Sequence, residues 1–173
     1  MPIIDALLAE MDQEAQTTAR VLERVPQSKL SWKPHPKSFS LGQLALHVAT
    51  VPGMVAQLAA QDVIAEPPQF VQSEAATAAE LVPSLHASTA RARQLLGHLD
   101  DEAMMKTWRL QSGGRDLMAM PRAAFVRAVM LNHWYHHRGQ MLVYLRMHDV
   151  PLPSVYGPTA DENPFAAAVA AAR

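Results

Sequence analysis

Residues 132–146 read NHWYHHRGQMLVYLR, and this stretch decides the fold that we expect for the chain. Apolar residues recur on both sides of it at helical spacing, so the pattern predicts a helix over residues 121–148. His133 and His137 are four residues apart and therefore share one face of that helix, with Cβ atoms about 5–6 Å apart. Two imidazoles in this relation can converge on one metal ion, whereas His136 points away from their face.

Two ligands make a poor metal site, and the sequence offers a third in residues 40–53, SLGQLALHVATVPG. His47 lies there on a helical stripe of mostly apolar residues that is expected to face the core. A polar ring on that face needs a partner, and packed helices lie about 8–10 Å apart, close enough for both to bind one ion. An HxxxH pair alone is more often a surface or core feature, so the predicted site for one divalent ion depends on His47, His133 and His137 occurring together.

Three further helical segments complete the predicted fold. The expected helices cover residues 3–25, 40–62, 77–99 and 121–148, and an irregular Pro-rich and Ala-rich tail covers residues 149–173. Ser40 and Gln43 have the spacing of a capping box, and Pro52 predicts a kink or a restart inside the second helix. The pair Gly113-Gly114 predicts a tight turn, either a small hairpin or a loop over one end of the bundle. With almost no other strand signal, we expect an all-α four-helix bundle with Pro-rich linkers, a single domain over residues 1–173.

Composition and missing motifs exclude several classes of function. The 173 residues are 49% apolar and 18% charged with a formal net charge of −1, which lacks the basic excess of a nucleic-acid-binding domain. Cysteine is absent, so thiolate metal sites and cysteine nucleophiles are excluded. No uninterrupted apolar stretch approaches the ~18–20 residues of a membrane span, and the first residues carry acids where a signal sequence is basic. We therefore expect a cytoplasmic protein with neither a membrane nor a nucleic acid as partner. Neither Glu-x-x-His nor HExxH occurs, which argues against a di-iron bundle and a zincin protease.

The sequence resembles the DinB/YfiT-like superfamily from about residue 5 to residue 163. The resemblance is carried by SLGQLALHVATVPG, by the preceding WKPHPKSF, by HWYHHRGQ and by VYGPTADE near the C-terminus. It implies a four-helix bundle of mirror-type connectivity, a homodimer, and three histidines that bind nickel, zinc or a similar divalent ion. Matched motif to motif, those histidines are His47, His133 and His137. Some relatives act with low-molecular-weight thiols such as mycothiol or bacillithiol, so the resemblance also implies a thiol cosubstrate as one option.

Three imidazole ligands leave at least one metal position open, which is typical of a catalytic site. A metal ion there can lower the pKa of bound water toward ~7 or stabilise a thiolate, which a chain without cysteine must take from another molecule. Gln140 and Tyr144 follow His137 by one and two turns, so each is a candidate to orient a ligand ring or to bind substrate. The alternative for Gln140 is a buried hydrogen bond to the backbone, and the alternative for Tyr144 is core packing.

Two classes of function fit these residues. The first is a metal-dependent enzyme, a transferase or hydrolase that acts on a small molecule, with an external thiol as one possible cosubstrate. The second is a non-catalytic metal-binding protein of a stress response or an interaction bundle. Around the site we expect Trp32 and His35 either to cover the metal or to pack within their loop, and Arg138 to form an ion pair at the surface.

Overall fold

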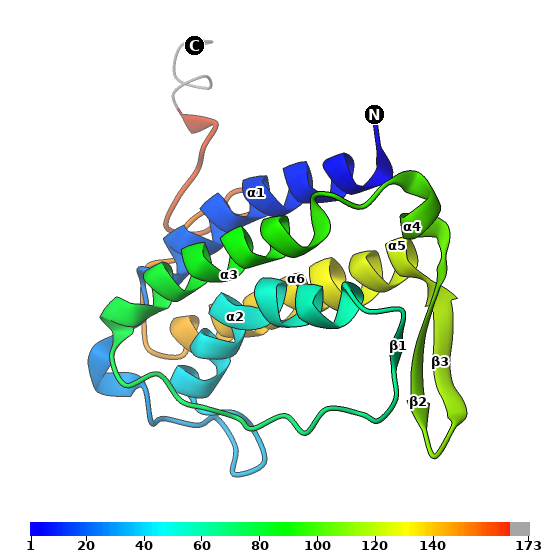
Figure 1. The fold of residues 1–173 in the computed structure, drawn as a ribbon. Helices are drawn as coiled ribbons and strands as arrows, with labels where there is room; N and C mark the ends of the chain where they lie inside the picture. The colour runs from blue at the N-terminus through cyan, green and yellow to red at the C-terminus, as the bar shows by residue number, and fades with distance from the viewer. Residues whose placement is uncertain (167–173) are drawn as a thin grey trace.

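Residues 1–166 are described by a computed structural model, in which α1 and α3 pack over α2 and α6 (Figure 1). The chain is mostly helical, and its fourth long helical segment is built from three consecutive pieces, α5, η3 and α6. In chain order the elements are α1 (Ile3–Leu22), η1 (Gln27–Lys29), α2 (Leu41–Ala59), β1 (Val63–Ile64), η2 (Ala78–Glu80), α3 (Leu81–Leu96), α4 (Asp101–Met105), β2 (Thr107–Ser112), β3 (Arg115–Pro121), α5 (Arg122–Phe125), η3 (Val126–Asn132) and α6 (His133–Arg146).

The predicted capping box at the start of α2 is confirmed. The Ser40 hydroxyl accepts a hydrogen bond from the Gln43 backbone N–H at 3.0 Å, and the Gln43 side-chain oxygen accepts one from the Ser40 N–H at 2.9 Å. Each bond satisfies a donor that the first turn of a helix leaves unpaired. Pro52 lies inside α2, yet the helix continues past it to Ala59, so no new helix starts there.

The helix ends differ from the sequence expectation by a few residues. α1 and α3 each end three residues earlier than expected, at Leu22 and Leu96, and α2 ends at Ala59. α3 starts at Leu81, after the short 3-10 turn η2, because residues 78–80 form the tighter helix that often precedes an α-helix. The Ala-rich end of the expected tail, residues 167–173, lies outside the described residues.

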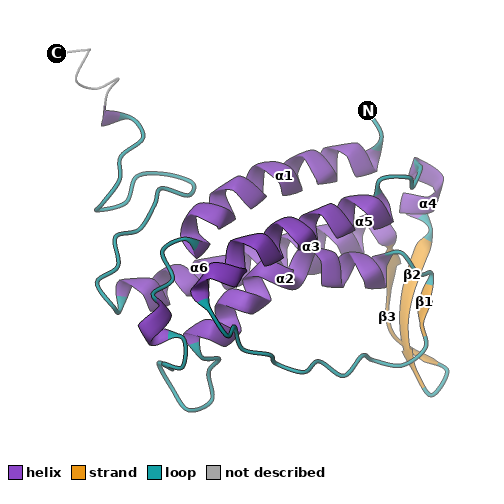
Figure 2. Cartoon of the chain, turned by 60° about the vertical axis from the view of Figure 1, so that its left-hand side comes forward, coloured by secondary structure: helices purple, strands orange, loops and turns teal. Residues whose placement is uncertain are grey.

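The all-α expectation needs one correction, because a three-stranded sheet lies at one end of the bundle (Figure 2). β2 and β3 form an antiparallel hairpin around Gly113 and Gly114, whose φ angles are +56° and +76°. Both values lie in the left-handed region that glycine adopts without strain, so the predicted turn is a hairpin. β1 adds a parallel strand of only two residues, too short for any sequence pattern to reveal.

A buried tryptophan fastens this sheet to the helices. Trp108 of β2 stacks on Phe125 with ring centroids 3.7 Å apart, and its indole N–H donates to the Leu58 carbonyl near the end of α2. Both rings are almost fully buried. The sheet therefore depends on contacts between distant segments, which explains why local strand signals were weak.

α2 is the most apolar helix of the bundle. It is long and apolar enough, by length and composition, to cross a membrane, with a mean hydropathy of 1.2 over the most apolar window. The same window is 61% buried inside the protein, where α2 packs between α3 and the α5–α6 segment. Its hydropathy thus reflects a core helix of the bundle, and the helix brings His47 into the interior.

Candidate metal centre

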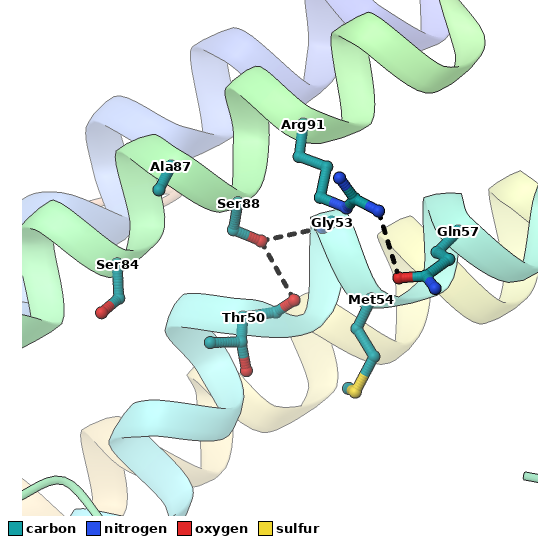
Figure 3. A pocket seen from close by; sticks show the side chains of 8 residues that line it. All are labelled: Thr50, Gly53, Met54, Gln57, Ser84, Ala87, Ser88 and Arg91. Atoms are coloured by element: carbon teal, nitrogen blue, oxygen red, sulfur yellow. Dashed lines mark hydrogen bonds between the residues drawn. The ribbon is translucent and has the colours of Figure 1, made fainter.

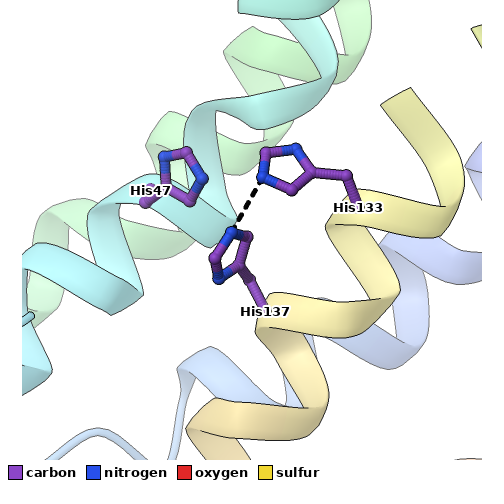
Figure 4. Close-up of side chains that lie close together, drawn as sticks. All are labelled: His47, His133 and His137. Atoms are coloured by element: carbon purple, nitrogen blue, oxygen red, sulfur yellow. Dashed lines mark hydrogen bonds between the residues drawn. The ribbon is translucent and has the colours of Figure 1, made fainter. Parts of the chain in front are cut away.

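Three histidines from two helices converge between α2 and α6. His47 comes from the middle of α2, and His133 and His137 lie one turn apart at the start of α6 (Figure 4). One ring nitrogen of each lies within 4.8 Å of the others, and all three residues are half-buried. The structure therefore brings together the three residues that spacing and resemblance had singled out.

The nitrogen separations suit a shared metal ion. The Nε2 atoms of His133 and His137 are 2.8 Å apart, and Nε2 of His47 is buried without any hydrogen-bond partner among the described residues. Two nitrogens bound to one ion at about 2.0–2.1 Å each are about 3 Å apart, close to the separation found. A buried polar atom without a partner is costly, and a metal ion between the three rings removes that cost. The donor set therefore fits a divalent ion.

Burial keeps these rings neutral. Burial, with smaller contributions from charge on His137 and His133, lowers the pKa of His47 to about 4. Burial also lowers the pKa of His133 and of His137. A metal ligand must be a neutral imidazole with a free lone pair. At pH 7 all three rings meet that requirement before any ion binds.

Gln140 fixes the orientation of one ring. Its side-chain oxygen lies 2.8 Å from Nδ1 of His137, one helical turn earlier. If Nδ1 carries the proton, it donates to that oxygen and leaves the lone pair of Nε2 directed toward the other two histidines. This contact corresponds to the orienting role considered for Gln140 from the sequence.

A tryptophan adjacent to His133 joins α6 to α2 next to His47. Pro52 has no N–H, so the carbonyl four residues earlier, that of Val48, loses its usual helical donor. The indole N–H of Trp134 donates to this same carbonyl at 2.7 Å, and Trp134 is fully buried. Because Val48 follows His47 and Trp134 follows His133, this bond joins the two ligand-bearing helices directly beside two of the ligands.

The turn before His133 is unusual. Residues Val126–Asn132 form the π-helical segment η3, which leads directly into α6. π-helical turns are rare and accumulate at functional sites, because the wider turn changes the direction in which the following side chains project. No periodicity in the sequence had indicated this segment.

Tyr144, Trp32 and His35 are the remaining residues that the sequence suggested for the site. Tyr144 and His148 both pack edge-to-face against Trp32, with ring centroids 5.6 Å and 4.3 Å from it, and His35 is exposed. The linker aromatic that does contact the cluster is Phe39, whose ring centroid is 5.9 Å from that of His47 and 6.3 Å from that of His137. Its place just before the cap of α2 was a signal that sequence reasoning had not used.

The expectation that Arg138 forms an ion pair at the surface is wrong. Arg138 is 1% exposed and pairs with Glu14 of α1 at 2.6 Å. The face of α6 opposite the histidines packs against α1 and the C-terminal segment, so a residue pointing away from the cluster is still inside the protein. His136, by contrast, is exposed, as its position on the helix predicts.

A small cavity opens beside His47. Its volume is about 250 Å³, and its other walls come from α2 and from the loop between β1 and η2. The lining residues are Leu46, His47, Thr50, Met54, Phe70, Val71, Gln72 and Ser73. One histidine of the cluster therefore borders a mostly apolar cavity.

A helical bundle with a small sheet and three convergent, neutral histidines defines a class of protein that can bind one metal ion between two helices. The chain belongs to the DinB family, whose model matches residues 2–164. It is 25% identical over 160 residues to the uncharacterized protein YrdA of Bacillus subtilis (strain 168), covering 92% of this chain and 91% of YrdA.

Two solved structures share the fold. A DinB-like protein from Bacillus cereus ATCC 10987 superposes with a TM-score of 0.68 at 22% identity, over 88% of this chain and 97% of its own. The DinB-like protein YjoA of Bacillus subtilis gives a TM-score of 0.64 at 19% identity, over 86% of this chain and 96% of its own. At these identities the similarity establishes the fold alone.

Proposed function

We propose that the protein binds one divalent metal ion, nickel or zinc, through His47, His133 and His137 and uses it as a catalytic centre. The observation that carries the proposal is the convergence of three imidazole nitrogens within 4.8 Å, one of them buried without a partner. Such a nitrogen is an unexplained cost in a protein that binds no ion. Three protein ligands also leave a position for water or substrate, as catalytic metal sites do.

The surroundings support turnover of a small molecule. The cavity beside His47 is mostly apolar and borders one residue of the cluster, as pockets for small molecules do. A metal ion bound there acts as a Lewis acid that activates water or stabilises a thiolate. The chain's own residues bind and orient: Gln140 holds the His137 ring, and Phe39 covers the cluster from the linker side.

The reaction that we propose is a group transfer to, or a hydrolysis of, a small molecule. The nucleophile is itself a small molecule from outside the protein, either water or a thiol. The chain has no cysteine, so a thiol, if one takes part, is a cosubstrate. The homodimer implied by the resemblance is part of the same proposal.

Metal content of the untagged protein tests the binding step. We expect about one ion per chain in the wild type and a large loss in His47→Ala or His133→Ala, measured by elemental analysis after exhaustive dialysis. His136→Ala is the matched control, because this exposed residue lies next to His137 but outside the cluster. A wild-type content well below one ion per chain, unchanged by His133→Ala, contradicts the proposal.

Turnover needs a separate measurement. We expect the metal-loaded protein to accelerate the reaction of small electrophiles with members of a panel of low-molecular-weight thiols or with water, relative to the metal-free protein. Full metal binding without any such acceleration favours a non-catalytic metal-binding protein.

A further inference from the structure

A second cavity continues the cavity beside His47 along the groove between α2 and α3. Its volume is about 400 Å³, and it shares Thr50 and Met54 with the first cavity. His47, Thr50, Met54 and Gln57 are spaced three, four and three residues apart, so they form one continuous stripe of α2. The groove therefore runs from His47 along the helix to Gln57.

The walls of both parts of this groove are mostly apolar, and a charged side chain lies at its far end. At the His47 end the lining is mostly apolar, with Leu46, Phe70 and Val71. At the far end Arg91 of α3 reaches across to α2, and its guanidinium lies 3.5 Å from the side-chain oxygen of Gln57 (Figure 3). One end can thus hold a group that binds metal, the middle an apolar chain, and the far end an anion.

Arg91 has no acidic partner within residues 1–166. Its guanidinium donates one long hydrogen bond, to the neutral side chain of Gln57. Arg93, two residues later, pairs instead with Asp12 of α1. A guanidinium is a fork of donors suited to carboxylate or phosphate, and one that borders a cavity is available to a ligand.

Hydrogen bonds hold the middle of the groove at a fixed width. The Ser88 hydroxyl of α3 donates to the Thr50 carbonyl at 3.0 Å and accepts from the Gly53 N–H at 2.8 Å. A Cβ at Gly53 would lie 2.8 Å from the Ser88 carbonyl oxygen, so only glycine permits this approach of α2 to α3. The groove is thus a built part of the helix packing.

We propose that this groove binds the substrate of the metal centre, and that Arg91 with Gln57 receives an anionic group of that substrate, a carboxylate or a phosphate. The inference rests on the proposed function and deepens it. Gln57 is ten residues beyond His47, which is about 15 Å along a helix. The substrate is therefore an extended molecule with a metal-binding end, an apolar middle and an anionic end.

Probes with these three parts test the inference. Hydroxamic acids bind divalent ions, so we choose the monohydroxamates of straight-chain dicarboxylic acids of increasing length, each with its methyl ester as the uncharged partner. Binding to the zinc- or nickel-loaded protein is measured by calorimetry. We expect the acid to bind about three- to tenfold more tightly than its ester, only at chain lengths that approach about 15 Å.

Substitutions of Arg91 test whether this side chain causes the preference for the acid over the ester. Arg91→Ala removes the advantage of the acid over the ester and leaves metal content unchanged, Arg91→Lys keeps part of it, and Arg91→Glu reverses it. Arg115→Ala is the matched control, because this exposed arginine of the hairpin lies outside both cavities and its loss leaves the preference intact. High salt reduces the preference in the wild type, since the guanidinium is exposed.

The outcomes separate this inference from the proposed function. The esters can bind the wild type but not His133→Ala, while the acid is preferred at no chain length. This result overturns the proposed substrate groove and leaves the proposed metal centre standing. A loaded protein that binds neither acid nor ester also overturns the groove, whereas a protein that takes up neither zinc nor nickel overturns the metal centre. A change in sedimentation in Arg91→Ala without a change in preference shows that the groove contacts a second copy, which also overturns the inference.

Discussion

The hydrogen bond that the Gln140 side-chain oxygen accepts from His137 shows how a single residue can tune the cluster. Nδ1 of His137 and the side-chain oxygen of Gln140 are 2.8 Å apart, so the neutral ring is held with Nε2 toward its two partners. Groups that orient a ligand ring in this way typically contribute about 10–100-fold to metal affinity. Gln140 is exposed, so its replacement removes the bond without opening a cavity in the core.

We therefore expect Gln140→Leu to weaken metal binding about tenfold, at the low end of that range because of the exposure. Gln140→Glu should retain the affinity, since a carboxylate accepts from the same N–H. Competition with a chromophoric chelator measures both. Equal affinities in wild type and Gln140→Leu, with unchanged thermal unfolding, contradict the orienting role.

The lowered pKa of His47 predicts how the metal-free protein responds to acid. Burial, together with the neighbouring His137 and His133, lowers this pKa to about 4, whereas histidine in an unfolded chain titrates near ~6.5. Between these values the unfolded chain binds more protons, so the free energy of unfolding falls as the pH falls from about 6.5 toward 4. Above that window the contribution of the neutral ring is complete.

Urea unfolding of the metal-free protein at pH 7 and pH 5 measures this effect. We expect the wild type to lose about 1 kcal/mol more than His47→Gln over this interval, after allowance for solvent screening of the half-buried ring. An identical pH dependence in the two proteins means that His47 titrates normally when folded.

At the scale of elements, the bond between Trp134 and Val48 is the connection of α2 to α6 nearest the cluster. The carbonyl of Val48 is free because Pro52 has no N–H, and the buried indole satisfies it. Losing the partner of a buried carbonyl costs about 1–3 kcal/mol, and here it also loosens the two ligand-bearing helices.

A double-mutant cycle tests this connection. Trp134→Phe should lower the free energy of unfolding and weaken metal binding, because the Val48 carbonyl loses its donor. Adding Pro52→Ala supplies an N–H four residues after Val48, so the double variant should recover about 1 kcal/mol relative to Trp134→Phe alone. Additive effects of the two substitutions on urea unfolding show that the carbonyl does not link them.

The elements also show how much of the fold and of the site could be predicted from the sequence. The i,i+4 spacing of His133 and His137 correctly predicted that they share a face, and a polar ring on the apolar face of α2 correctly predicted that His47 meets them. Pro52 predicted a kink or a restart in α2, but not that Trp134, 82 positions later, would donate to the Val48 carbonyl. Such partners depend on which helices become neighbours, and periodicity carries no information on this. The π-helical segment η3 and the two-residue strand β1 escaped prediction for the same reason.

At the scale of the whole molecule, α6 lies between two clusters of polar side chains. Its inner face carries the histidine ligands toward α2, and its opposite face carries Arg138 toward α1 and the C-terminal segment. Helical spacing alone assigned Arg138 to the surface, because it reports which face a residue occupies and not what covers that face. The C-terminal segment covers it: the Tyr156 hydroxyl accepts from Arg138 at 2.7 Å and donates to Glu14 at 3.0 Å.

Further contacts hold the same segment in place. Arg20 of α1 binds the Glu162 carboxylate at 2.6 Å and the Ser154 carbonyl at 3.3 Å, and Arg146 of α6 pairs with Asp161. These last pairs are substantially exposed and contribute little each. The buried pair of Arg138 and Glu14 should therefore dominate the attachment of α6, α1 and the C-terminal segment to one another.

Arg138→Met leaves Glu14 buried without its cation, and the expected loss in the free energy of unfolding is about 3–5 kcal/mol. Arg138→Met combined with Glu14→Leu should lose less than the single change, because no uncompensated charge remains, and Tyr156→Phe should lose only about 1 kcal/mol. Urea unfolding of the metal-free variants gives these values. If the double variant is less stable than Arg138→Met, the pair holds the fold by something other than charge compensation. Since the histidines project from the opposite face of α6, metal content per folded chain should stay the same in every one of these variants.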